Sequence, residues 1–322
     1  MGITATTQSW KMVTEELRLI QALRVKRDWS GALAAIRALA DQHPTDPAIR
    51  YSLGLELLAQ GDFAEGFALY EERRRVGRDQ VIAPPLTYPE WDGEPVDSLL
   101  VWCDQGFGDA IMFARYIPRL FDYAKRLTIV CRPELERLFS QLGAQTIPFR
   151  SQMSVPRHTA WSFIGSLPHK LRVTLRDLDG AAYLSAPARS IGAKVGVAWK
   201  GRPTHVNDRN RSFLQNPLPL PSLQPEDTGA HDFQDTAEII SGLDLVISVD
   251  TSIAHLAGAI GKPVWILLPY LNTDWRWLRE RQDSPWYDSA LLFRQPALGD
   301  WTSVLADVQL RLGSLAPLPK PE

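Results

Sequence analysis

Two acidic turns contain the groups of this sequence that could take part in chemistry. Asp250-Thr251-Ser252 follows the apolar run Leu245–Val249, and Gly106-Phe107-Gly108-Asp109 follows the apolar run Ser98–Cys103. Each turn precedes a helical pattern, so free backbone N–H groups favour an anion such as phosphate there. A carboxylate in such a turn is also a candidate general base. The alternative is local, because Asp, Thr and Ser commonly cap a helix or place a favourable charge at its start.

A histidine and a cationic loop lie where they could help to hold a phosphate group. His255 is one helical turn beyond the Ser252 turn, on the face that a bound anion would touch, and it favours a binding site over a simple cap. Lys200 and Arg211 belong to a basic loop in a chain of net charge −2. One helix terminus contributes about 0.3–1 kcal/mol per charge, whereas millimolar affinity requires about 4 kcal/mol. Cationic side chains would have to supply the rest; a solvated surface loop is the alternative.

The remaining motifs are less specific. Gly106 and Gly108 let the backbone approach a ligand closely, but residue 111 is Ile, so the turn is not a dinucleotide-binding fingerprint. The aromatic-rich segments Asp274–Trp277 and Ser284–Tyr287 favour packing over ligand contact. No triad elbow, Walker loop, zinc-binding set or paired-carboxylate spacing is present.

Composition describes an ordinary globular protein. The 322 residues are 45% apolar and 22% charged, and the nearly neutral balance argues against a general nucleic-acid binder. Cys103 and Cys131 lie in or beside apolar runs and predict buried free thiols in a reducing compartment. We find no signal-peptide pattern and no apolar run long enough to span a bilayer, which favours a cytoplasmic location.

The amino-terminal segment, residues 1–80, predicts helical repeats. Asp28 and Asp62 start similar segments 34 residues apart, which is the period of tetratricopeptide repeats. Ala32, Gly54 and Gly66 are small residues at positions where paired helices must approach closely. Two such repeats are expected, with a generic pair of helical hairpins as the alternative.

The rest of the chain alternates strand and helix patterns. A Pro-rich connector, residues 81–96, precedes two further segments, at 97–190 and at 191–322. Strands are expected at Leu127–Cys131, Ala193–Trp199 and Val264–Leu268, and helices at Ala110–Tyr123 and Pro133–Leu142. The fold class is therefore α/β with an α-helical appendage, containing two Rossmann-like domains whose turns face a cleft.

Seven short motifs occur in a characteristic order along the chain. They are Trp91–Pro95, Asp104–Asp109, Phe113–Tyr116, Trp199–Gly201, Asn207-Asp208 with Arg211-Ser212, Asp232–Thr236 and Val249–Leu256. In this order they resemble the bacterial tetratricopeptide-repeat glycosyltransferases, whose catalytic part is similar to glycosyltransferase family nine, the lipopolysaccharide heptosyltransferases. The resemblance covers nearly the whole chain and implies a GT-B fold, with residues 97–190 as the acceptor-side domain and residues 191–322 as the donor domain. It also implies inverting, metal-independent transfer from a nucleotide-sugar, with no further cofactor.

The resemblance assigns roles to the two turns. Asp109 matches the general base, in a turn formed with Gln105, Gly106 and Gly108. The residues that match the donor-binding set are Asp250, Thr251, Ser252 and His255. Lys200 or Arg211 would stabilise the leaving diphosphate. The implied acceptor is a glycan, a lipid-linked molecule or a protein, with lipopolysaccharide core and flagellin-type proteins as candidates.

The chain departs from the family between Ser212 and His231, where prolines leave little room for the usual helix. This departure keeps an alternative open: a non-catalytic scaffold with a degenerate transferase domain, binding a protein partner through the helical repeats. A sugar-nucleotide-processing enzyme such as an epimerase of the same fold is a weaker rival. Peripheral association with the inner membrane is a further option for a transferase with a lipid-linked acceptor.

Overall fold

The computed structural model describes residues 3–76, 84–205 and 207–314. The predictions for residues 77–83, at the end of the repeats and the start of the connector, lie outside these described residues. The chain divides into two compact units. The first consists of Met1–Thr87 and Pro168–Asp177, and the second of Tyr88–Leu167 and Leu178–Glu322. The chain therefore leaves the second unit at residue 167 and returns to it at residue 178.

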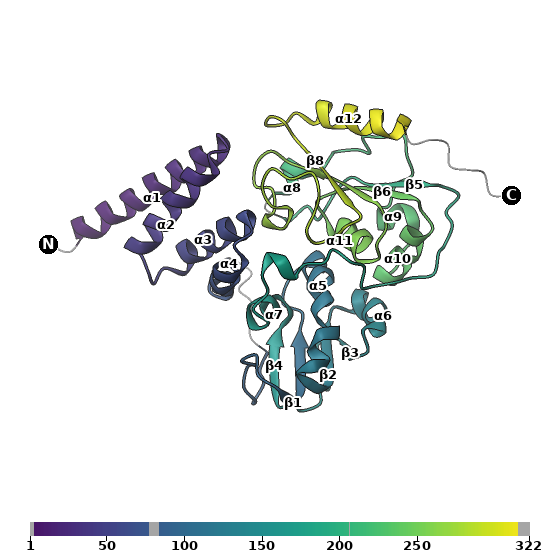
Figure 1. The fold of residues 1–322 in the computed structure, drawn as a ribbon, viewed down its shortest axis with the longest axis horizontal. Coiled ribbons are helices and arrows are strands. Elements are labelled where there is room, and N and C mark those ends of the chain that lie inside the picture. The colour runs from purple at the N-terminus through teal and green to yellow at the C-terminus, as the bar shows by residue number, and fades with distance from the viewer. Residues whose placement is uncertain (1–2, 77–83, 206, 315–322) are drawn as a thin grey trace. The chain divides into compact units, whose positions relative to one another are not determined.

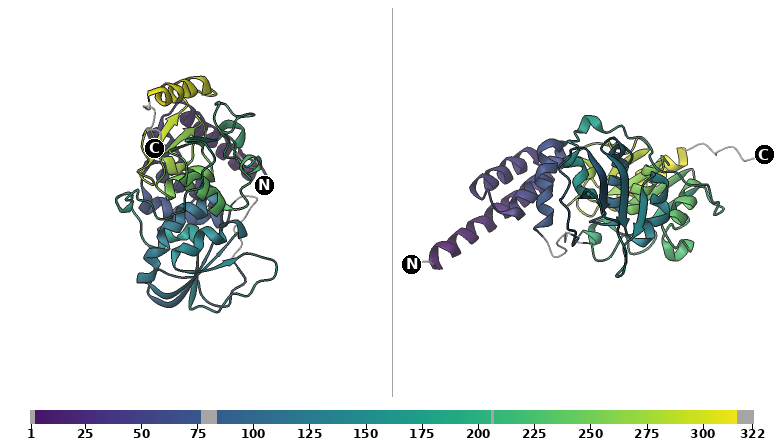
Figure 2. Two further views of the ribbon diagram at one scale, coloured as in Figure 1. Left: turned by 90° about the vertical axis from the view of Figure 1, so that its right-hand side faces the viewer. Right: turned by 90° about the horizontal axis from the view of Figure 1, so that it is seen from below.

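The first unit is helical. Its long helices are α1 (Ile3–Val25), α2 (Trp29–Gln42), α3 (Pro47–Gln60) and α4 (Phe63–Tyr70), and successive helices pack side by side (Figures 1 and 2). Asp28 and Asp62 are equivalent: they accept hydrogen bonds from the Gly31 N–H at 2.9 Å and the Glu65 N–H at 3.4 Å, and so cap α2 and α4. A Cβ atom on Gly54 would lie 2.9 Å from Leu69 Cβ. The helical appendage is thus present, with the close helix approach that its small residues predict.

The second unit contains two parallel sheets. The first has the order β3-β2-β1-β4, with β1 at Val96–Trp102, β2 at Ala124–Cys131, β3 at Gln145–Pro148 and β4 at Ala160–Phe163. Its α-helices are α5 (Phe107–Phe113), α6 (Glu136–Phe139) and α7 (Leu167–Lys170), of which α7 continues into the first unit. Leu99, Leu100 and Val101 are completely buried, as parallel strands covered on both faces should be.

The second sheet has the order β5-β6-β7-β8 and is also parallel. Its strands are β5 (Val195–Ala198), β6 (Leu245–Val249), β7 (Val264–Leu268) and β8 (Ala290–Arg294). The helices around it are α8 (Asp208–Arg211), α9 (Pro225–Thr228), α10 (Phe233–Ser241), α11 (Ser252–Ala259) and α12 (Trp301–Ser314). The strands predicted at 245–249 and 264–268 are confirmed to the residue.

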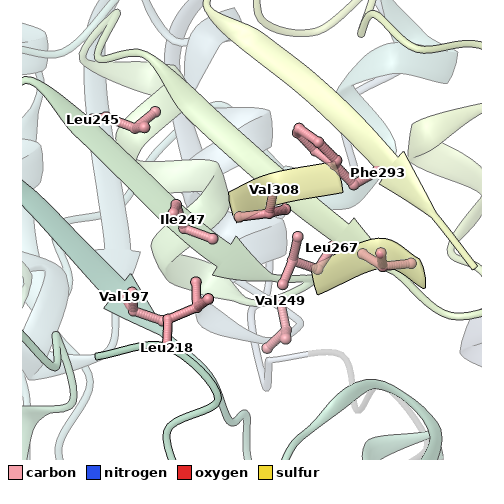
Figure 3. Close-up of a cluster of buried hydrophobic side chains, with 9 residues drawn as sticks. Val197, Leu218, Leu245, Ile247, Val249, Leu267, Phe293 and Val308 are labelled. Carbon is pink, nitrogen blue, oxygen red and sulfur yellow. The ribbon is translucent and has the colours of Figure 1, made fainter. Parts of the chain in front are cut away.

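Strand β6 lies in the centre of the core and is buried along its whole length. Leu245, Ile247 and Val249 lie on one face, where they form a cluster with Leu267 and Val308 (Figure 3). Val308 belongs to α12, which therefore covers this face of the sheet, while α11 also packs against β6 and β7. Helix α11 starts directly beyond the end of β6, so this packing fixes the position of the Asp250 turn.

Two helix predictions were wrong in extent. The helix expected at 110–123 is α5, which ends at Phe113 and gives way to 3-10 turns at Ala114–Tyr116 and Pro118–Asp122. Pro118 lacks an N–H donor and its ring opposes a continuous α-helix. The helix expected at 133–142 is α6, a single turn between 3-10 turns.

Other expectations are met. Between Ser212 and His231 the described helix is α9, a single turn at Pro225–Thr228, and the other regular feature is an isolated bridge from Ser222 to Val197. This agrees with the little room expected for a helix in that segment. Cys103 and Cys131 are free thiols, and burial raises the pKa of both. Among the described residues, no helix is both long enough and apolar enough to cross a membrane.

Candidate functional site

The Asp109 turn connects β1 to α5. Gly106 is the N-cap of α5, and one oxygen of the Asp109 carboxylate accepts a hydrogen bond from the Gly106 N–H at 3.0 Å. In the same turn Asp104 accepts from the Gly165 N–H at 3.0 Å, and Gln105 is half-buried. Asp109 therefore does carry charge at a helix start, as its local interpretation requires. Its second oxygen contacts a residue from a distant part of the sequence.

The Asp250 turn connects β6 to α11. Thr251 is the N-cap of α11, but its side chain makes no capping hydrogen bond, and its hydroxyl lies 3.2 Å from the Ser248 hydroxyl. The first N–H groups of an α-helix have no partner within the helix. Because Thr251 does not satisfy them with its side chain, the geometry of this turn suits an anion better than it suits a simple cap.

The two turns meet through Gly108. A Cβ atom on Gly108 would lie 2.9 Å from His255 Cδ2 and 3.5 Å from Ser252 Cα. Phe107 also packs against Phe233, with 4.8 Å between ring centroids. Only a residue without a side chain allows the first turns of α5 and α11 to approach this closely. The structure thus brings together the two turns that the sequence singled out.

Arg276 links the two turns, and its role was missed in the sequence. It lies in the 3-10 turn Trp275–Trp277, and its side chain is only 5% exposed. Nη1 contacts both carboxylate oxygens of Asp274, at 2.9 and 3.0 Å, while Nη2 donates to the second oxygen of Asp109. The guanidinium carbon lies 4.3 Å from the centroid of the Trp275 ring. The segment expected to serve packing alone therefore supplies the ion pair of the candidate base.

Charges within this cluster shift one another's pKa values. Burial raises the pKa of Asp109, and Asp274 and Asp104 add to this effect while Arg276 opposes it. Burial acts on Asp274 in the same direction, but Arg276 outweighs it and holds the pKa of Asp274 below its ordinary value. Burial, reinforced by Asp274, raises the pKa of Asp250 to about 6. Such perturbed carboxyl groups are typical of functional sites.

Arg211 is held at the start of α11, as a phosphate-binding role would require. Its side chain is buried, Nη1 donates to the Asp250 carbonyl, and Nε lies 3.5 Å from Asp208. A Cβ atom on Gly201 would lie 2.8 Å from Arg211 Nη2 and 3.2 Å from Thr251 Cγ2, so the Lys200-Gly201 backbone also packs here. The Lys200 side chain does not join this group: its ammonium pairs with Glu226 of α9 and lies 4.9 Å from the centroid of the Trp199 ring.

His255 is buried between the turns. Its Nδ1 lies 3.0 Å from the Tyr287 hydroxyl, and its ring stacks on Trp277 at 5.0 Å. Burial, with the nearby charge of Arg276, lowers the pKa of His255 to about 3. The ring is therefore neutral at pH 7 and can offer a hydrogen bond to a phosphate, but not a charge.

Comparison with known families gives a match in the region of the second sheet. Residues 228–290 match the model of glycosyltransferase family 9 (heptosyltransferase). This range contains β6, α11, β7 and the Arg276 turn, and it lies entirely within the second unit. The Asp109 turn lies outside the matched range.

One curated relative and several solved structures are similar to the chain. Protein FlbA of Caulobacter vibrioides is 26% identical over 341 aligned positions, which cover 85% of this chain and 56% of FlbA. The chain thus spans little more than half of that relative. A glycosyl transferase family 9 structure from Veillonella parvula is 10% identical, covers 69% of this chain and 93% of its own, and gives a TM-score of 0.40. The iron-containing dodecameric glycosyltransferase TibC of enterotoxigenic E. coli is 14% identical, with 72% and 81% coverage and a TM-score of 0.38.

Proposed function

We propose that this chain is a glycosyltransferase that moves a sugar from a nucleotide-sugar to a hydroxyl group of a glycan, a lipid-linked molecule or a protein. The observation that carries the proposal is the convergence of Asp109, the start of α11 and Arg276 in one buried cluster. The match of residues 228–290 to glycosyltransferase family 9 supports the donor half of this arrangement.

In the proposed reaction the acceptor hydroxyl attacks the anomeric carbon of the donor sugar. Asp109 takes the hydroxyl proton as the new carbon–oxygen bond forms and the bond from carbon to the diphosphate oxygen breaks. The electron pair of the broken bond passes to the diphosphate. The start of α11 and the Arg211 guanidinium are placed to stabilise that charge, and attack from the opposite face inverts the anomeric carbon. The raised pKa of Asp109 favours this role, because a more basic carboxylate accepts a proton more readily.

The same proposal includes three further points: the transfer needs no metal ion, the protein is cytoplasmic, and the helical unit binds a protein partner. Asp250, Thr251, Ser252 and His255 would surround the donor diphosphate, and Lys200 would contribute only if its ammonium left Glu226. Gln105, Gly106 and Gly108 would line the acceptor side of the site.

A second candidate function is a non-catalytic scaffold. It is favoured by the segment from Ser212 to His231, where the helical structure consists of the single turn α9, since a reduced donor domain would hold its nucleotide poorly. The two functions differ in nucleotide binding, which can be measured directly.

Calorimetric titration of the full chain with ADP, GDP, UDP, CDP and dTDP and with their sugars tests the proposal. A transferase should release heat with at least one nucleotide. In that case Asp109→Asn should lower the transfer rate by at least about 100-fold, because a general base typically contributes 10²–10⁴-fold. Asp97→Asn is the matched control, since Asp97 lies in the same lobe with its side chain 86% exposed. A silent titration with every nucleotide would favour the scaffold.

A further inference from the structure

Arg276 makes two different kinds of contact with its two terminal nitrogens. Nη1 is fixed: it contacts both oxygens of Asp274, two residues earlier in the same turn. The Trp275 ring supports the guanidinium plane at 4.3 Å, and the backbone N–H of Arg276 also donates to Asp274, at 3.0 Å. Nη2 reaches instead to Asp109, which lies 167 positions away in the sequence. The anchor is therefore local, and the Asp109 contact is the one that can be exchanged without moving Arg276.

The surroundings of Nη2 favour a second anion at the same place. Gly108, adjacent to Asp109, packs against Ser252 and His255, so the backbone of the Asp109 turn lies beside the first turn of α11. The charge of Arg276 also acts on Asp250 and His255. It opposes the rise in the pKa of Asp250 and contributes to the lowered pKa of His255. A diphosphate at the start of α11 would thus lie within the reach of a guanidinium group, whose planar donors suit phosphate as well as carboxylate.

The balance of charges in the cluster favours a change of partner by Arg276 Nη2. The carboxylates that face one another are Asp109, Asp274, Asp250 and Asp104, and the facing cations are Arg276 and Arg211, with His205 near Asp109 and Asp274. During the proposed transfer, Asp109 gains a proton and loses its charge in the same step in which the diphosphate gains charge. A guanidinium group that has moved to the diphosphate on binding is then in place to stabilise this added charge as the bond breaks.

We propose that Arg276 Nη2 changes partner from Asp109 to the donor diphosphate, so that the base and the leaving group share one cation. This inference rests on the proposed glycosyl transfer and adds to it a residue that contacts the donor. In the resting protein Asp109 is held by Arg276 and competes with the nucleotide for Nη2. When the nucleotide binds, Asp109 is released as a stronger base.

A double-mutant cycle on the full chain tests this exchange. The probe is whichever of ADP, GDP, UDP, CDP and dTDP the wild-type protein binds, measured by calorimetry. Asp109→Asn removes the competing charge and should tighten nucleoside diphosphate binding by about tenfold, which is the scale of one charge-assisted hydrogen bond. Arg276→Gln should weaken binding by at least about tenfold. The double variant should bind the nucleotide like Arg276→Gln alone. Without the Arg276 guanidinium there is no cation for which Asp109 and the diphosphate could compete.

Asp104→Asn is the control for simple charge removal. Asp104 lies in the same turn as Asp109 and bonds to the Gly165 N–H, which an Asn oxygen can still accept. The Asp104→Asn variant should gain less nucleotide affinity than Asp109→Asn, because Arg276 Nη2 donates to the carboxylate of Asp109. If Arg276→Gln fails to fold, Arg276→Lys, which keeps the charge but loses the planar fork, replaces it.

The outcomes separate this inference from the proposed function. If the wild-type protein binds a nucleotide but Asp109→Asn leaves the affinity unchanged or weakens it, the exchange is wrong and the transferase proposal stands. An equal gain with Asp104→Asn also overturns the exchange, because the effect would then be general electrostatics. If no nucleotide binds to the wild-type protein, both proposals fail together.

Discussion

Burial of the Asp250 carboxylate works against folding. Its pKa is raised to about 6, whereas an unfolded Asp titrates at about 3.9. Between these values the folded state binds more protons, so the contribution of this group to stability is complete below about pH 4 and is lost as the pH rises through about 6. A carboxylate kept at such a cost beside a helix start is consistent with binding rather than with stability.

Asp250→Asn should therefore stabilise the protein near neutral pH. The expected gain is about 3 kcal/mol at pH 7.5, falling towards zero near pH 4, because a shift of one pKa unit corresponds to about 1.4 kcal/mol. Urea unfolding of the variant and the wild type at several pH values measures the difference. His255 has the opposite pH dependence: because its pKa is lowered in the folded state, it costs stability as the pH falls below the pKa of histidine in the unfolded chain. The variant and the wild type share this effect, so it cancels when they are compared. A gain that does not change with pH would contradict this explanation.

Asp109 and Asp250 could be found in the sequence because each follows an apolar strand and opens a helix. Arg276 could not be found in this way, since its contact with Asp109 spans 167 positions and depends on how two sheets are arranged. A weak signal was present: Arg276 and Asp274 are charged residues placed among tryptophans, and charged side chains that share a buried aromatic setting are usually paired. Lys200 shows a second limit of the sequence, which could not reveal that its ammonium pairs with Glu226.

Helices α5 and α11 depend on Gly108 for their close approach. In Gly108→Ala the new Cβ would lie 2.9 Å from the His255 ring. This ring cannot move away, because it is stacked on Trp277 and hydrogen-bonded to the Tyr287 hydroxyl. The substitution should destabilise the protein by about 1–3 kcal/mol, as overpacking does. Thermal unfolding of the variant measures this loss, and nucleotide affinity should fall with it because the two turns separate.

Gly313→Ala provides the matched control in a different helix. Gly313 is exposed near the end of α12, and a Cβ atom there would meet no atom within 4 Å. This substitution should stabilise the protein by up to about 1 kcal/mol through helix propensity alone. If both variants shifted stability in the same direction, contact with His255 would not be the reason for the glycine at position 108.

The strands that form the core were easier to predict than the helices. β6 and β7 are continuous apolar runs, and such runs identify strands buried on both faces. β3 and β8 escaped prediction, because β3 has no more than four residues and β8 follows a long aromatic loop. The helix predicted beyond Phe113 is not formed, because the periodicity of apolar residues takes no account of Pro118. This proline removes a backbone N–H donor and favours shorter turns.

The helical unit is completed by residues that are distant in the sequence. Pro168–Asp177 belongs to it, and a Cβ atom on Gly61 would lie 3.0 Å from Leu175. The fragment 1–87 lacks this segment, so it should show a broad, non-cooperative thermal transition by circular dichroism. A fragment of this kind that melted as sharply as the full chain would refute the expectation. The 34-residue spacing predicted the helices but could not reveal this distant segment, which has no repeat signature.

This excursion of the chain also orders events during synthesis. Helices α1 to α4 leave the ribosome first, but residues 168–177 follow only after most of the first sheet has been made. At roughly 5–20 residues per second, translation would delay completion of the helical unit by several seconds. During that interval the amino-terminal helices would form an incomplete unit that is exposed to chaperones and proteases, while strands β1 to β4 are synthesised after them.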